Sequence, residues 1–187
     1  MKNDIFKGKL VRLATEKSQV LAAAMAKWQR DSEFHRLLDS EPTMAPSVKG
    51  TKDWIEKFIE KEDDSLIFFS IHALEDDRLI GFIGLDGIQW THGDTFVFIA
   101  LGEHAYWGKG YGTDAMQVIL RYAFTELNLH RVSLDVFAYN PRAIRTYEKT
   151  GFQYEGRFRK YLNRDGERAD MLFMGILREE WLRKQED

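Results

Sequence analysis

Residues 106–115 read YWGKGYGTDA, and their three glycines alternate with other residues immediately before a helix-forming segment. Glycine lets the backbone adopt positive φ angles and lets a ligand approach without meeting a Cβ atom. Free N–H groups at the start of a helix, together with the helix dipole, favour anions. This stretch therefore predicts a strand-to-helix loop that binds a phosphate-bearing ligand.

Two common phosphate-binding patterns do not fit these glycines. The Walker A loop ends in Gly-Lys-Ser/Thr, whereas Lys109 lies between Gly108 and Gly110 and is not followed by Ser or Thr. The dinucleotide-binding pattern G-x-G-x-x-G needs two residues before its last glycine, whereas one residue separates Gly110 from Gly112. Taken alone, the glycines also fit a plain flexible turn.

The segments that flank the glycines predict strands and helices in alternation. Residues 95–101 (TFVFIAL) form a β-rich run, and apolar residues then recur at helical spacing between 116 and 127. Residues 131–139 (RVSLDVFAY) predict a strand. Residues 140–151 (NPRAIRTYEKTG) predict a short helix with an Asn cap at its start, Pro at its first position and Gly after its end.

The first third of the chain predicts one strand and two helices. Residues 8–14 form the strand, and Thr15 is expected to cap the helix that follows it. Residues 39–50 contain two prolines and predict a loop, which ends where a second helix starts at Thr51. Within that helix, Trp54, Ile55, Phe58 and Ile59 share one face, and we expect Trp54 and Phe58 to lie in the core.

Four further β-rich runs predict two hairpins. The runs 65–74 and 78–90 are joined by a short acidic turn, and the runs 152–162 and 168–177 flank Asp165-Gly166, a strong hairpin-turn pair. With the other elements, these hairpins predict an α/β domain built around one mixed sheet.

Composition limits the functions that are open to this chain. The 187 residues are 44% hydrophobic and 30% charged, which is typical of a globular protein, and the net charge of −3 argues against broad binding of nucleic acid. The chain has no cysteine, which excludes a disulfide framework and a cysteine nucleophile. No signal peptide, membrane span or paired histidine spacing is seen, so we expect a cytoplasmic protein without membrane or metal.

The glycine segment and the segment NPRAIRTYEKTGF together resemble the two hallmark segments of the GNAT superfamily of N-acetyltransferases. Gly110 and Gly112 match the glycine positions of the family's acetyl-CoA loop, and Asn140, Ala143 and Tyr147 match its second pattern, N-x-x-A-x-x-x-Y. The resemblance is greatest to the branch of ribosomal-protein N-terminal and spermidine acetyltransferases. It implies a single domain over residues 1–187, with a mostly antiparallel twisted sheet of six to seven strands and about four helices.

The resemblance also implies a cosubstrate and the residues that bind it. The backbone of the glycine loop would hold the pyrophosphate of acetyl-CoA, in a gap where strands 95–101 and 131–137 splay apart. A backbone N–H at the end of the first strand would meet the oxyanion. Lys109, Arg142 and Arg145 are candidates for the CoA phosphates, or else ordinary surface charges. The expected cofactor-binding residues are Leu101, Gly108, Lys109, Gly110, Tyr111, Gly112, Thr113, Asn140 and Arg145, and no metal is expected.

Catalysis in this family implies direct attack of an amine on the thioester. Tyr147 matches the general acid that protonates the CoA thiolate. Relatives often carry a base in the fourth strand, but residues 95–101 contain no carboxylate. Glu103 and His104 lie just beyond that strand, and we assign neither. Trp107 stands where the family pattern has Gln or Arg.

The acceptor implied by the resemblance is a primary amine, such as a protein N-terminus, a polyamine or another small amine. Its site would lie between the early helices and the last hairpin, where carboxylates could bind a cation or serve as ordinary surface charges. These are Asp31, Glu33, Asp39, Glu41, Asp165, Glu167 and Asp170. Asp114, in the first turn of a helix, is expected to point outward, away from the diphosphate.

The sequence also allows two alternative functions and a second copy of the chain as a partner. A non-catalytic CoA-binding sensor and a nucleotide-binding protein with an unusual phosphate loop are the alternative functions. Homodimers are common among proteins similar to this one, so a second copy of the chain is the partner that the resemblance allows.

Overall fold

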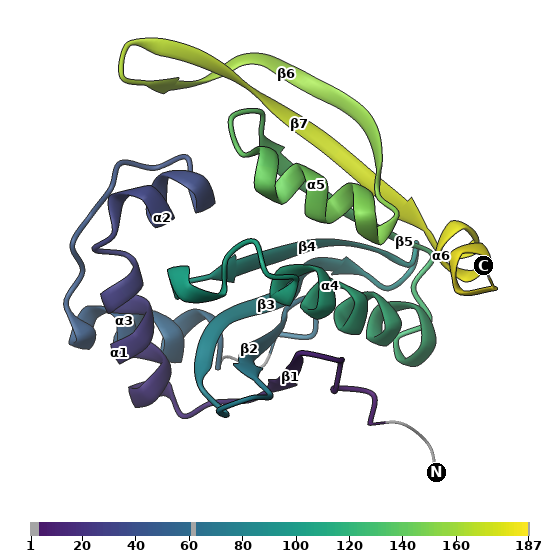
Figure 1. Cartoon of the computed structure of the whole chain (residues 1–187), viewed down its shortest axis with the longest axis horizontal. Helices are drawn as coiled ribbons and strands as arrows, with labels where there is room; N and C mark the ends of the chain where they lie inside the picture. The colour runs from purple at the N-terminus through teal and green to yellow at the C-terminus, as the bar shows by residue number, and fades with distance from the viewer. Residues whose placement is uncertain (1–3, 61–62, 187) are drawn as a thin grey trace.

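One seven-stranded sheet, with the strand order β1-β2-β3-β4-β5-β7-β6, organises the computed structural model, which describes residues 4–60 and 63–186 (Figure 1). All neighbouring strands are antiparallel except β4 and β5, which are parallel. The mostly antiparallel mixed sheet predicted from the sequence is therefore confirmed. The strands are β1 (Val11–Ala14), β2 (Ile67–Ala73), β3 (Leu79–Gln89), β4 (Asp94–Leu101), β5 (Arg131–Phe137), β6 (Gln153–Arg164) and β7 (Glu167–Leu177).

The parallel strands β4 and β5 pair over only part of their length. Asp94 lies opposite Arg131 and Phe96 lies opposite Ser133, and the register ends there. Beyond this point β4 continues to Leu101 along β3, and β5 continues to Phe137 along β7. The predicted splay is therefore present, and it opens at the carboxyl ends of both strands.

Helices cover both faces of the sheet. Successive residues of β3 belong to different clusters of buried side chains, because side chains alternate across a strand: Ile83 packs in the cluster that contains α4, and Phe82 in the cluster that contains α1 and α3. The helices are α1 (Ser18–Trp28), α2 (Ser32–Leu38), α3 (Val48–Phe58), α4 (Tyr111–Arg121), α5 (Pro141–Thr150) and α6 (Arg178–Glu186). No helix in the described part of the chain combines the length and the apolar character needed to cross a bilayer.

Capping residues and turns explain the elements that the sequence predicted well. The Asn140 side chain accepts a hydrogen bond from the N–H of Ala143 at 3.1 Å, which caps α5 as predicted. Gly151 follows α5 with a φ of 108°, and Asp165 and Gly166 form the hairpin turn with φ angles of 53° and 82°. Each of these positions has the residue type that its backbone conformation favours.

Several predicted boundaries in the first third of the chain are wrong. Helix α1 starts at Ser18 and not after Thr15, with Lys17 at the N-cap position. Ser47 caps α3 by accepting from the N–H of Gly50, so the helix begins inside the predicted loop. Two helices were not predicted. Asp31 caps the seven-residue α2, and α6 is a polar helix anchored by the buried Trp181.

Trp54 and Phe58 do not lie in the core. Their side chains are 46% and 48% exposed, whereas Ile55 is 1% exposed. The buried face of α3 follows Thr51 and Ile55, which are one turn apart. Trp54 lies one residue before Ile55, and Phe58 lies one residue before the next position of the buried face. Each is therefore rotated by about 100° around the helix axis and faces solvent.

Candidate active site

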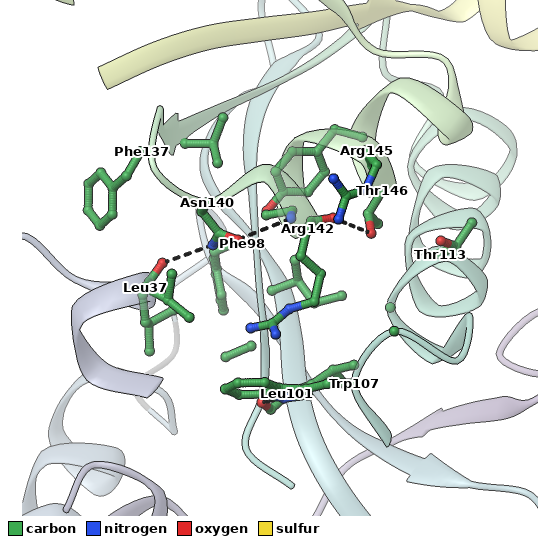
Figure 2. A pocket seen from close by; sticks show the side chains of 18 of the residues that line it. Leu37, Phe98, Leu101, Trp107, Thr113, Phe137, Asn140, Arg142, Arg145 and Thr146 are labelled. Carbon is green, nitrogen blue, oxygen red and sulfur yellow. Dashed lines mark hydrogen bonds between the residues drawn. The ribbon is translucent and has the colours of Figure 1, made fainter. Parts of the chain in front are cut away.

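A cavity of about 430 Å³ occupies the gap between the diverging strands (Figure 2). In the close-up, Leu37 and Phe137 lie on one side of it, and Thr113, Arg145 and Thr146 lie on the other. We call the first side the α2 end and the second side the glycine-loop end. The α2 end comprises Phe34, Leu37, Leu38, Phe98 and Phe137, and the glycine-loop end comprises Gly108, Gly110, Gly112, Thr113, Arg145, Thr146 and Lys149.

The glycine loop leads directly into the N-terminus of α4. Gly108 and Gly110 have φ angles of 71° and 94°, a backbone conformation that favours glycine. The first helical hydrogen bond runs from the N–H of Asp114 to the carbonyl of Gly110 at 2.9 Å. The N–H groups of residues 111–113 therefore have no acceptor within the helix. This cluster of donors, at the positive end of the helix dipole, is suited to an anion.

Asp114 does not point outward, which corrects the sequence-based expectation. Its carboxylate is buried and accepts hydrogen bonds from the N–H groups of Lys9, Leu10 and Val11 at 3.0, 2.7 and 3.0 Å. These three charge-assisted bonds satisfy the carboxylate away from the cavity. Asp114 therefore fastens the first turn of α4 to the chain that enters β1.

Trp107 connects the glycine loop to β4 and to α5. Its indole N–H donates to the carbonyl of Leu101 at 2.6 Å, and the guanidinium of Arg142 stacks on its ring, with 3.8 Å between the guanidinium carbon and the ring centroid. Desolvation lowers the pKa of Arg142, against the opposing charge of Glu33. Trp107 stands where the family pattern has Gln or Arg, and α5 supplies a cation over the same position.

Tyr147 and Asp135 face the cavity from α5 and β5. Burial raises the pKa of Tyr147 well above its ordinary value, and the charge of Asp135 raises it further. Asp135 is exposed to solvent, yet the cavity wall partly desolvates its carboxylate and raises its pKa. Sequence reasoning missed Asp135, although it is the one carboxylate in the strand RVSLDVF.

Most of the predicted site residues line this cavity. They are Leu101, Gly108, Gly110, Gly112, Thr113, Asn140, Arg145 and the predicted acid Tyr147. Lys109 is exposed, and Tyr111 is buried with its hydroxyl donating to Glu75 at 2.9 Å, so neither side chain is among the lining residues. Binding of acetyl-CoA by the backbone of both residues, and of a CoA phosphate by the Lys109 side chain, stays a prediction.

Glu103 and His104 contact other side chains, and the His104 ring stacks on Trp107 with 3.7 Å between centroids. Glu103 accepts from Lys27 at 2.7 Å and from the indole of Trp28 at 2.9 Å. Burial alone would raise the pKa of Glu103, but these bonds and the charges of Lys27 and Arg78 outweigh burial and lower it. The imidazole of His104 lies 2.5 Å from the carboxylate of Asp31. Neither residue lines the cavity.

The acidic residues predicted from the sequence are likewise outside the cavity wall; two of them are paired with arginine and a third contacts a histidine. Asp31 pairs with His104, Asp165 pairs with Arg36, and Asp170 lies 3.3 Å from Arg157. Helix α2 is held over the cavity by other contacts. The Tyr139 hydroxyl donates to the carbonyl of Arg36 at 2.6 Å, and the Asn140 amide donates to the carbonyl of Leu37 at 3.5 Å.

Comparison with known proteins identifies related chains. Residues 11–153 match the family model of the acetyltransferase (GNAT) domain. An uncharacterized N-acetyltransferase derived from the SPbeta prophage of Bacillus subtilis (strain 168) is 30% identical over 81% of this chain and 82% of its own. A spermidine N(1)-acetyltransferase of Vibrio cholerae is 32% identical over 71% of this chain and 83% of its own.

Solved structures of similar fold include a spermidine N-acetyltransferase from Vibrio cholerae in complex with CoA and spermine. Its structure superposes with a TM-score of 0.81 over 92% of this chain and 98% of that chain, at 24% identity. An acetyltransferase of the GNAT family from Bacillus anthracis gives a TM-score of 0.77 at 23% identity, over 94% of this chain and 99% of that chain.

Proposed function

This chain belongs to the GNAT acetyltransferase family and is an N-acetyltransferase, and we propose that it transfers the acetyl group of acetyl-CoA directly to a primary amine. One observation carries the proposal. A cluster of helix N-terminal N–H donors and the buried Tyr147 line the same cavity, in the gap where β4 and β5 separate. An anion-binding end and a proton donor are the two groups that this transfer needs from the protein.

The glycine-loop end fits the phosphates of acetyl-CoA. Gly108 and Gly110 shape the loop, and the N–H groups of residues 111–113 would bind the pyrophosphate. Arg145 and Lys149 line the same end and add positive charge. Arg142, whose guanidinium is partly desolvated on Trp107, is a further cation that an incoming phosphate would pair with.

The edge of β4 fits the thioester. The N–H of Gly102 donates to the carbonyl of Ile80 on β3 at 2.9 Å. Because alternate residues of an antiparallel strand face opposite neighbours, the N–H of Leu101 faces away from β3, toward the cavity that Leu101 lines. This N–H is the donor that would stabilise the oxyanion.

Tyr147 would supply the proton that the departing thiolate needs. Its raised pKa keeps the phenol protonated at neutral pH, so it can act as a general acid. The chain contains no cysteine that could carry the acetyl group as a thioester. We therefore propose direct attack by the amine, with both substrates bound together.

The acceptor is proposed at the level of a primary amine. The related Vibrio cholerae protein is named a spermidine N(1)-acetyltransferase, which supports an amine as the acceptor here. Protein N-termini, polyamines and other small amines are the candidates at this level.

A thermal-shift titration with acetyl-CoA, CoA, ATP and NAD tests the proposal first. A ligand at a hundredfold excess over its Kd stabilises the native state by about 2.7 kcal/mol. We expect acetyl-CoA and CoA, and neither ATP nor NAD, to raise the melting temperature, and release of the CoA thiol to depend on an added amine. A shift with ATP or NAD instead, or CoA binding without acetylation of any amine, would overturn the proposal.

A further inference from the structure

The α2 end of the cavity is apolar. Phe34 and Leu38 belong to the same side-chain cluster as Phe98, and Phe34 packs against Trp28 at 6.4 Å between ring centroids. Phe137 adds a further aromatic wall from the end of β5, next to Tyr139. The five side chains of this end offer no hydrogen bonds, and Asn140 beside them already bonds Ala143 and the carbonyl of Leu37 (Figure 2).

Asp135 is the only carboxylate that lines the cavity among residues 4–60 and 63–186. It lies two residues beyond Ser133, where β5 has already separated from β4. Side chains alternate along a strand, so Asp135 shares a face of β5 with Phe137 and not with Leu134 and Val136, which are buried in the α4 cluster. Within the described part of the chain, Asp135 forms no ion pair.

The other charged side chains that line the described cavity are cations: Arg142, Arg145 and Lys149. A polyamine brings two or more ammonium groups. One could pair with Asp135, whereas those that enter the cavity would find no second carboxylate among its described lining residues and would face apolar walls or like charges. A charge that leaves water without a partner is costly. An acceptor with a single amine and an apolar skeleton avoids both penalties.

We propose that Asp135 binds the acceptor amine and that the preferred acceptor is a monoamine whose ammonium group adjoins an apolar skeleton, not a polyamine. This inference rests on the proposed acetyl transfer and narrows its substrate class. The apolar skeleton occupies the α2 end against Leu37 and Phe137. Two sources present this chemistry, a small arylalkyl or alkyl amine and a peptide N-terminus with an apolar first residue.

Asp135 then takes part in the reaction by accepting a proton. It receives one proton from the ammonium group, directly or through water, which frees the nitrogen lone pair. A C–N bond forms at the thioester carbon, the C–S bond breaks, and Tyr147 gives its proton to the thiolate. A second proton leaves the nitrogen, and solvent exchange restores Tyr147 and Asp135. The net products are the amide, CoA and one proton.

The test measures kcat/KM for 2-phenylethylamine, the peptide Phe-Ala-Gly and spermidine, with wild type and Asp135→Asn. We expect at least one monoamine to exceed spermidine by about tenfold or more. Asp135→Asn should lower kcat/KM for that monoamine by about 100-fold or more. The thermal shift with acetyl-CoA should persist in Asp135→Asn, since the variant leaves the glycine-loop end intact. The ratio of kcat/KM for 2-phenylethylamine to kcat/KM for Phe-Ala-Gly distinguishes a small amine from a peptide N-terminus as the acceptor.

Two further variants make the result specific. Asp53→Asn removes a carboxylate at an exposed position on α3, outside the cavity wall, and it should change kcat/KM by less than about twofold. Leu37→Glu adds a carboxylate to the α2 end at a half-buried helical position, and it should shift the preference toward spermidine by about tenfold.

The possible outcomes separate this inference from the proposal on which it rests. A wild-type protein that shifts with acetyl-CoA but prefers spermidine, or acetylates neither monoamine, overturns the inference and leaves acetyl-CoA binding in place. Full activity of Asp135→Asn overturns the role of that residue. The absence of any acetyl-CoA shift and of any acetyl transfer overturns the proposed function and this inference together.

Discussion

The two ends of the cavity are held by different kinds of contact. At the glycine-loop end, local chemistry sets the backbone: Gly108 and Gly110 have positive φ angles, and the first hydrogen bond of α4 returns to the carbonyl of Gly110. At the α2 end, hydrogen bonds between distant parts of the chain hold the segments in place. The Tyr139 hydroxyl donates to the carbonyl of Arg36, which lies 103 residues earlier in the sequence. The Arg164 guanidinium donates to the carbonyl of Asp39, which lies 125 residues earlier.

From this difference we infer that the glycine-loop end binds acetyl-CoA and that the α2 end selects the acceptor. A loop whose backbone conformation follows from its own glycines presents the same N–H groups to each ligand, which suits a constant ligand part such as a phosphate. An end assembled from α2, β5 and the last hairpin changes whenever any of those segments changes, which suits the part of the site that meets a variable acceptor. The predictions below test this division, and they run from the largest expected change in free energy to the smallest.

Tyr147→Phe should have the largest effect, and it should leave both ends intact. Loss of a general acid lowers kcat by about 10²- to 10⁴-fold, whereas acetyl-CoA affinity should stay within about twofold because the ring still fills its place. Steady-state kinetics and a thermal-shift titration measure the two quantities.

The pH profile of the wild type gives a second check on Tyr147. Burial raises the pKa of this phenol, so its proton is retained above the ordinary value of about 10. The rate should therefore show no loss from Tyr147 ionisation below pH 10. A Tyr147→Phe enzyme that retains wild-type kcat would remove Tyr147 from the mechanism.

Asp114→Asn tests whether the glycine-loop end also needs a distant anchor. The carboxylate accepts three N–H bonds from residues 9–11, and an amide would turn an NH₂ group toward those donors. We expect the free energy of unfolding to fall by about 2 to 4 kcal/mol, measured by urea denaturation. Asp53→Asn, at an exposed position on α3, is the control and should be neutral. If Asp114→Asn were equally neutral, the loop would be self-sufficient.

Sequence patterns predicted the parts of the fold that local chemistry determines. The seven strands follow from β-rich runs and turn pairs, and α5 follows from Asn140, Pro141 and Gly151. Helix α2 gives no clear sequence signal because seven residues form too short an apolar pattern, and because an aspartate such as Asp31 fits a surface charge as well as a helix cap. Helix α6 was missed because Trp181 is its one buried apolar residue.

The site divides in the same way. Tyr147 and the glycines could be placed from two short motifs, and both line the cavity. Asp135 could not be assigned to the site from a motif, because its access to the cavity depends on where β4 and β5 separate. The stacking of Arg142 on Trp107, 35 residues apart in sequence, likewise depends on the packing of α5 against the loop.

Arg142→Met removes the cation over Trp107 at the glycine-loop end. We expect acetyl-CoA to bind about 10-fold more weakly, which is roughly the 1.4 kcal/mol of one charge-assisted hydrogen bond. Arg142→Lys keeps the positive charge but not the planar group that stacks on Trp107, and it should lose less acetyl-CoA affinity than Arg142→Met. Isothermal titration calorimetry measures both, with Arg159→Met on the exposed face of β6 as the control. Unchanged affinity in Arg142→Met would limit the loop to backbone recognition of phosphate.

Tyr139→Phe should have the smallest effect, and it should be confined to the α2 end. The variant deletes the 2.6 Å hydrogen bond to the carbonyl of Arg36, which contributes about 0.5 to 1.5 kcal/mol. If that energy keeps α2 in place over the cavity, the acceptor KM should rise by about 2- to 10-fold, with kcat and acetyl-CoA affinity unchanged. Tyr154→Phe, at a 57% exposed position, is the matched control. Helix α2 lines the end of the cavity where the acceptor is proposed to bind. An equal loss of acetyl-CoA affinity in Tyr139→Phe would therefore mean that the two ends move together and that acetyl-CoA binding and acceptor selection are not separable.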